Sequence, residues 1–106
     1  MKNSVMDLEQ MQLAADQACR MMKVLANPDR LLILCQLSQG ERRVGELEDL
    51  LGIVQRTLSQ QLTVLRSEEL VSTRREGKNI HYALTNPKAL AVMQVLYEQF
   101  CVCKSE

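Results

Sequence analysis

Apolar side chains recur at helical spacing through the first part of the chain. Between Leu8 and Leu25 they follow one another at intervals of three and four residues, which predicts one face of a helix, and Asp7 precedes them as a cap. The seam of this first helix consists of Leu8, Met11, Ala15, Ala18, Met22 and Leu25. A second helix is predicted to begin at Asn27-Pro28, because Asn caps helices and Pro fits their first turn, and to stop near Gly40.

Two further helices are predicted around a glycine turn. The segment "VGELEDLLG" (44–52) predicts a short helix that ends at Gly52, and "QRTLSQQLTVLRSEEL" (55–70) predicts a longer one. The leucines expected to face inward are Leu47, Leu50, Leu51, Leu58, Leu62 and Leu65. Two such helices joined by a short turn are typical of a helix-turn-helix.

Strict alternation then replaces the helical spacing. The runs "LVSTRR" (70–75) and "NIHYALT" (79–85) flank Gly77, and Ile80, Tyr82 and Leu84 alternate with more polar positions. This pattern predicts a β-hairpin with one buried face.

A last helix is predicted to begin at Asn86-Pro87, which repeats the earlier helix-start signal. Its apolar side is expected to contain Leu90, Met93, Tyr97 and Phe100. The first and last helices carry more apolar surface than a small core needs, so they are expected to form the interface of a homodimer. The fold class is therefore mostly α with a small β-hairpin, in a single domain over residues 1–106.

Charge is unevenly distributed, although 13 basic and 13 acidic side chains give a formal net charge of zero. Residues 54–85 hold five basic and three acidic side chains, so a positive field is expected there. Nothing resembles a secretory signal or a membrane span, which favours a cytoplasmic protein without a membrane partner. In that compartment, four cysteines are expected to be thiols rather than a disulfide framework.

A helix-turn-helix followed by a basic hairpin predicts a winged helix that binds double-stranded DNA. Short polar side chains early in the second helix of the pair suit the major groove, and basic side chains on a hairpin suit phosphates or the minor groove. The candidate DNA-binding residues are Gln55, Arg56, Thr57, Ser59, Gln60, Arg74, Arg75 and Lys78. Two alternatives stay open, namely a merely solvated helix face and a winged helix that binds proteins.

Four segments together resemble a known family. In order and spacing, "NPDRLLILCQL", "VGELEDLLGI", "LSQQLTVLRSEELV" and "RREGKNIHYAL" are similar to the ArsR/SmtB winged-helix regulators, over about residues 8–101. The resemblance implies a homodimeric bacterial repressor that leaves its operator when an inducer binds. The chain departs from the family at Gln61, where His is common. It also departs at Val54, where a Ser or Thr usually caps the recognition helix and contributes about 1 kcal/mol.

Metal-sensing members of this family resemble one another in a Cys-rich motif before the recognition helix, or in Asp and His ligands on the last helix. Here the first position reads "ELEDL", and the last predicted helix contains neither Asp nor His. The single histidine, His81, lies on the hairpin, where a solvated or packed role is expected. The sequence therefore predicts no cofactor and no divalent-metal site.

Two cysteines occupy the inner sides of their predicted helices. Cys35 follows Leu31 by four residues and Leu32 by three, and Cys101 follows Tyr97 by four. Cysteines at these two helix positions resemble the persulfide-sensing subgroup of the family (the BigR, SqrR and HlyU type). The resemblance implies that the second and last helices lie side by side and bring the two thiols together.

The same resemblance implies a mechanism. Reduced protein would bind the operator, and persulfides or polysulfides would release it by joining Cys35 and Cys101 through an intrasubunit disulfide or polysulfide bridge. Two unrelated core cysteines are the alternative. A thiol enzyme is not expected, since no Cys-x-x-Cys motif or nearby histidine would activate a thiolate.

The remaining cysteines allow a second inducer. Cys35, Cys101 and Cys103 could together form a soft thiolate site for arsenite or a heavy metal. Cys103 is expected in an exposed tail, where it could also be a spare resolving thiol. Cys19 borders the seam of the first helix, and a packing role is expected for it.

Overall fold

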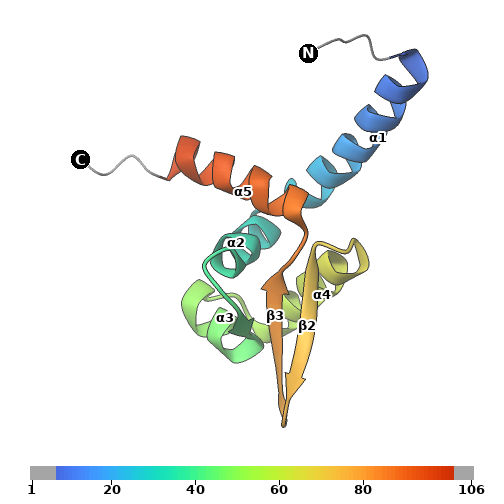
Figure 1. Ribbon diagram of the computed structural model, residues 1–106. Coiled ribbons are helices and arrows are strands. Elements are labelled where there is room, and N and C mark those ends of the chain that lie inside the picture. Colours follow the sequence, from blue (N-terminus) through green and yellow to red (C-terminus); the bar gives the residue numbers. More distant parts are fainter. Residues whose placement is uncertain (1–6, 102–106) are drawn as a thin grey trace.

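The computed structural model describes residues 7–101, which form five helices and three strands (Figure 1). The elements are α1 (Leu8–Leu25), α2 (Pro28–Leu37), β1 (Arg42–Arg43), α3 (Val44–Leu51), α4 (Gln55–Ser67), β2 (Val71–Glu76), β3 (Asn79–Leu84) and α5 (Pro87–Phe100). The predicted fold class is confirmed, because a helix-turn-helix (α3 and α4) is followed by a β-hairpin. The hairpin points away from the body on the side opposite to α1.

Side-chain caps begin three of the helices where the sequence predicted them. Asp7 Oδ1 accepts the Gln10 N–H at 2.9 Å, Asn27 Oδ1 accepts the Arg30 N–H at 3.0 Å, and the Asn86 side chain caps α5. At Val54, the cap of α4, the structure records no such side-chain bond, as the sequence implied.

The sheet contains one strand more than the predicted hairpin. Its order is β1-β3-β2 with antiparallel pairs, and the short β1 pairs Arg42 with Tyr82 and Arg43 with His81. The prediction that Ile80 lies on the buried face is wrong, since 39% of it is exposed. Ile80 lies beyond the two residue pairs that β1 forms with β3, toward the hairpin turn. Tyr82 and Leu84 are half-buried, in agreement with the predicted face.

The core forms where α2, α4 and the start of α5 meet. Its buried members are Val24, Leu25, Ile33, Leu34, Leu37, Leu47, Leu58, Leu62, Leu65, Leu70, Val71, Ala89 and Met93. The predicted inward side of α4 is therefore confirmed. Leu50 is a correction, because it is 55% exposed. On α3, Leu47 and Leu51 face α2, α4 and the sheet, and the helical turn carries Leu50 out to solvent.

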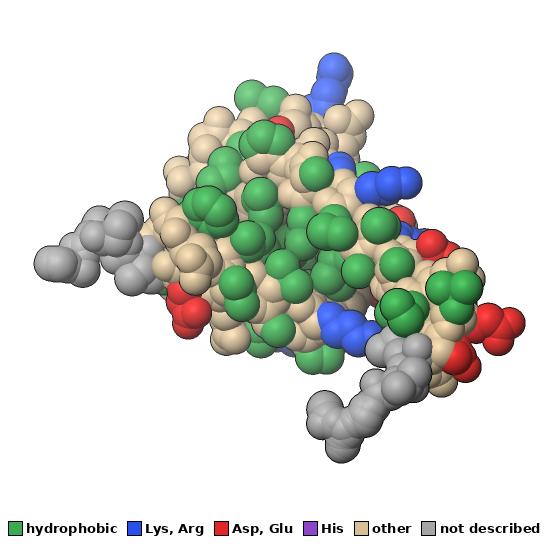
Figure 2. All heavy atoms as spheres, turned by 90° about the horizontal axis from the view of Figure 1, so that it is seen from above, with side chains coloured by type: hydrophobic (Ala, Val, Ile, Leu, Met, Phe, Trp, Pro, Cys, Tyr) green, Lys and Arg blue, Asp and Glu red, His purple; other side chains and the backbone are tan. Residues whose placement is uncertain are grey.

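The two outer helices leave apolar side chains uncovered. In α1 only Val24 and Leu25, next to α2, are buried. In α5 Ala89 and Met93 are buried, whereas Tyr97 and Phe100, which belong to the predicted apolar side, are exposed, Phe100 to 77%. The buried residues of α5 thus lie in its first half (Figure 1). Figure 2 shows apolar side chains gathered on the face that α1 and α5 form.

Within the described part of the chain, no helix is both long enough and apolar enough to cross a membrane.

Truncation of a core leucine is expected to destabilise the protein strongly. Leu62→Ala should lower the free energy of unfolding by about 2–5 kcal/mol, because the surrounding core cannot fill the cavity. Leu50→Ala, the matched control on the exposed side of α3, should change it by less than about 0.5 kcal/mol. Urea denaturation measures both values, and an equal loss in the two variants would contradict the assigned core.

Candidate dithiol site and nucleic-acid interface

A small hollow separates α2 from the second half of α5. It has a volume of about 270 Å³. It is lined by Leu31, Leu32, Cys35, Met93, Leu96, Tyr97, Phe100 and Cys101. The two cysteines that the sequence singled out therefore line one pocket, Cys35 from α2 and Cys101 from the residue that ends α5.

Local structure fixes both thiols. Cys35 lies within α2, where the Ser38 hydroxyl donates to its carbonyl at 2.6 Å, and its side chain is half-buried against the core. Cys101 is exposed, and its N–H donates to the Tyr97 carbonyl at 2.8 Å, which closes the last turn of α5. Leu32 departs from the expected inward side, because it stands 47% exposed at the rim of the pocket.

The pKa of the Cys35 thiol responds both to burial and to Cys101. Burial raises the pKa of the Cys35 thiol above its ordinary value of 9.0, and the negative charge of a Cys101 thiolate raises it further. A charge on Cys101 thus disfavours a charge on Cys35, in line with the position of both residues at one pocket.

The other chemistry-bearing residues of the sequence lie elsewhere. Cys19 is exposed on α1 within one chain, and its packing role stays a prediction, since the α1 seam is expected to lie in the dimer interface. Cys103 lies outside the described residues, and the three-thiolate site that includes it stays a prediction. Among residues 7–101 no three His, Cys, Asp or Glu side chains are grouped so that they could hold a metal ion. His81 is largely buried on β3, where its Nε2 lies 3.3 Å from Glu76 Oε1.

The outer face of α4 is polar, as a recognition helix requires. Gln55, Arg56, Ser59 and Gln60 are exposed, and Thr57 is half-buried. Leu58, Leu62 and Leu65 hold the opposite face in the core. The DNA-binding role of these five polar residues stays a prediction.

Gln61, next along α4, faces inward to the body. Its Oε1 accepts the Arg30 Nη1–H at 2.9 Å, and Arg30 Nε also donates to the Val24 carbonyl at 2.6 Å. Arg30 on α2 therefore joins the last turn of α1 to the recognition helix.

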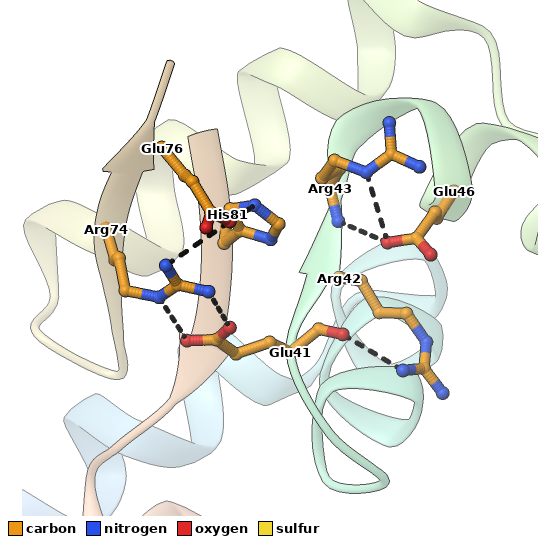
Figure 3. Close-up of polar contacts among 7 residues, drawn as sticks. All are labelled: Glu41, Arg42, Arg43, Glu46, Arg74, Glu76 and His81. Atoms are coloured by element: carbon orange, nitrogen blue, oxygen red, sulfur yellow. Dashed lines mark hydrogen bonds and ion pairs between the residues drawn. The ribbon is translucent and has the colours of Figure 1, made fainter. Parts of the chain in front are cut away.

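Among the predicted cations of the hairpin, Arg74 points toward carboxylates of its own chain (Figure 3). Arg74 donates two hydrogen bonds to the Glu41 carboxylate, from Nη2 at 2.8 Å and from Nε at 3.2 Å, and its Nη1 lies 3.5 Å from Glu76. The Arg74 hydrogen bond, with its charge, holds the pKa of the Glu41 carboxyl below its usual range. Arg74 is thus committed to carboxylates of its own chain, whereas Arg75 and Lys78 are exposed near the hairpin turn.

A polar α4 face beside a β wing defines the class as a winged helix-turn-helix DNA-binding regulator. A family model described as "Bacterial regulatory protein, arsR family" matches residues 27–73. The chain is 47% identical to the biofilm growth-associated repressor of Xylella fastidiosa over 96 residues. These aligned residues make up 91% of this chain and 84% of that protein. The chain belongs to the ArsR family of bacterial transcriptional regulators, which are not enzymes.

Other relatives agree over most of the chain. The transcriptional activator HlyU of Vibrio cholerae is 37% identical over 101 residues, 95% of this chain and 94% of that protein. The crystal structure of the transcriptional repressor BigR from Xylella fastidiosa, 47% identical, matches with a TM-score of 0.82 over 91% of this chain and 98% of that one. Reduced HlyU from Vibrio cholerae, 37% identical, matches with a TM-score of 0.85 over 89% and 99%.

Removal of the Glu41 carboxylate is expected to change stability in a pH-dependent way. Folding lowers the pKa of the Glu41 carboxyl below its unfolded value of 4.5, so its ionised form stabilises the fold above pH 4.5. This contribution is lost as the pH falls through the pKa of the folded state. Glu41→Gln should therefore be less stable than the unmodified protein at pH 7, and the difference should shrink below pH 4.5. Urea denaturation across this range measures it, with the exposed Glu98→Gln as control, and a difference independent of pH would contradict the Arg74 pair.

The proximity of the two thiols can be tested without any inducer. Cys101→Ser should lower the pH at which iodoacetamide alkylates Cys35, because one of the two causes that raise its pKa is removed. Cys19→Ser, far from the pocket lining, should leave that pH unchanged. Peptide mass spectrometry of the alkylated protein reports the result, and an unchanged profile in Cys101→Ser would place the sulfurs apart.

Proposed function

We propose that this chain is a dithiol-based transcriptional repressor that binds operator DNA as a homodimer when reduced. Persulfides release it by joining Cys35 and Cys101 through a disulfide or polysulfide bridge within one subunit. The observation that carries the proposal is that these two thiols, from α2 and α5, line a single pocket. The names of the relatives support repression. The biofilm growth-associated repressor is 47% identical to this chain, whereas the transcriptional activator HlyU is 37% identical.

The chemistry requires only the two thiols and a hydropersulfide, RSSH. One cysteine thiolate attacks the terminal sulfur of RSSH, the S–S bond breaks, and RS⁻ leaves behind a cysteine persulfide. The second thiolate attacks the protein-bound sulfur and expels HS⁻, which gives the disulfide. Two thiols are thereby oxidised while RSSH is reduced to RSH and H₂S. A second RSSH that supplies one more sulfur gives a trisulfide, with two RSH and one H₂S released.

The dimer is supported by the uncovered apolar surface. Most of the α1 seam is exposed, and Val92 and Val95 are exposed on α5. A second copy related by twofold symmetry would cover both helices and set two α4 helices against half-sites about 34–36 Å apart.

Transmission from the pocket to DNA is supported by the contacts of Arg30. This residue lies on the same helix as Cys35 and bonds both to α1, in the expected dimer interface, and to Gln61 of the recognition helix. A bridge that draws α2 toward α5 would act on both contacts at once. The spacing of the two recognition helices would then no longer match the operator.

Cysteine replacement tests the function. After treatment with glutathione persulfide, the unmodified protein should lose two hydrogens, with or without whole sulfur atoms gained, and bind its operator about 5- to 150-fold more weakly. Cys35→Ser and Cys101→Ser should bind DNA when reduced but show neither change, and Cys19→Ser should respond normally. Intact mass and mobility shift measure the two effects. Persulfide-induced release of either pocket variant would refute the proposal.

Two further reagents separate the alternatives. Hydrogen peroxide tests whether any oxidant suffices, and arsenite tests the soft-metal hypothesis. An arsenic adduct that releases DNA and requires Cys103 would favour the arsenite sensor over the persulfide sensor.

A further inference from the structure

The chemistry of the pocket lining restricts what can enter. Among the described residues that line it, none carries a charged side chain, and the six besides the cysteines are leucine, methionine, tyrosine or phenylalanine. Its volume of about 270 Å³ lies just below the range of drug-sized ligand pockets, which begins near 300 Å³. A ligand here is small and meets an apolar wall.

Apolar walls disfavour charge in two places on a persulfide. A carboxylate on the carrier group R loses hydration without gaining a partner, so a charged carrier binds less tightly than an uncharged carrier of similar size. The sulfur end is affected as well, because burial favours the neutral form of an acid, as it does at Cys35. Neutral RSSH is the electrophile that a thiolate attacks, whereas the anion RSS⁻ repels a thiolate.

We propose that the pocket between α2 and α5 selects its inducer by the carrier group, and takes uncharged hydropersulfides with a small apolar carrier in preference to charged ones. This inference rests on the proposed function, because it names the substrate class of the same two thiols. A benzyl carrier, which is the side chain of phenylalanine, matches the lining formed by Leu31, Tyr97 and Phe100.

The expected dimer leaves the pocket open. At 100° per residue, Val92 lies on the side of α5 opposite to Cys101, and Val95 lies about a third of a turn from it. A second copy that covers α1 and these valines therefore approaches α5 from a different flank than the pocket.

The reaction of benzyl hydropersulfide follows the same two steps as that of RSSH. A cysteine thiolate takes the terminal sulfur of benzyl hydropersulfide, and benzyl thiolate leaves. The second cysteine thiolate displaces HS⁻ and closes the disulfide. The products are the bridged protein, benzyl thiol and H₂S.

Two carriers that differ by one carboxylate test the selection. Full-length dimer is mixed with benzyl hydropersulfide or with 4-carboxybenzyl hydropersulfide, and the rate of bridge formation is followed by intact mass. We expect the uncharged carrier to react at least about tenfold faster, because the carboxylate loses hydration against the apolar wall. Free cysteine under the same conditions gives the ratio of the two reagents' intrinsic reaction rates. Dividing the protein's rate ratio by this value gives the corrected ratio.

A charge placed at the rim should reverse the preference. Leu32→Lys puts a cation at the edge of the pocket, and it should bring the corrected ratio close to one or favour the carboxylate. Leu50→Lys adds the same charge on exposed α3, away from the pocket, and should leave the ratio unchanged. Using the ratio removes any general effect of a lysine on thiolate reactivity.

The outcomes separate this inference from the function beneath it. Equal corrected rates for the two carriers, or the same ratio in Leu32→Lys and Leu50→Lys, would overturn carrier selection and leave the dithiol sensor standing. Failure of both reagents to form a bridge between Cys35 and Cys101 would overturn the dithiol sensor itself.

Discussion

Burial of one side of α2 is the constraint on which the other features depend. Ile33, Leu34 and Leu37 are fully or almost fully buried, and they fix the rotation of the helix about its axis. That rotation sets Cys35 toward α5, and it sets Arg30 between α1 and α4. The core, the thiol pocket and the link to the recognition helix therefore share one element, so a change on any side of α2 affects the other two.

Much of the fold could be predicted from local sequence, because its signals are local. The Asn-Pro pairs and Asp7 bond to N–H groups two or three residues away, and Gly52 takes the left-handed conformation that ends α3. Burial could be predicted less well. Leu50 and Ile80 satisfy their apolar patterns but are exposed, because exposure depends on how the elements pack against one another and is not visible in spacing.

The candidate site was predictable to a similar degree. The facing sides of Cys35 and Cys101 followed from helical spacing, but their partnership came from the family resemblance, since no local rule links residues 66 positions apart. The pairing of Arg74 with Glu41 was missed for the same physical reason. It joins residues 33 positions apart, and it depends on β1, which pairs with β3 and brings the preceding glutamate within reach of the Arg74 side chain. The sequence offered one signal, namely that Glu41 directly precedes two arginines, but this does not identify Arg74 as its partner.

The bond between Arg74 and Glu41 also changes the mechanics of the wing. A two-stranded hairpin is marginally stable alone, but here a third strand and a bidentate ion pair anchor the middle of its strands to the body. The wing then moves as a lever rather than as a hinged flap. Its six-residue strands span about 20 Å, so a body rotation of about 5° displaces the Lys78 end by about 2 Å. Small helix movements are thereby amplified at the wing tip.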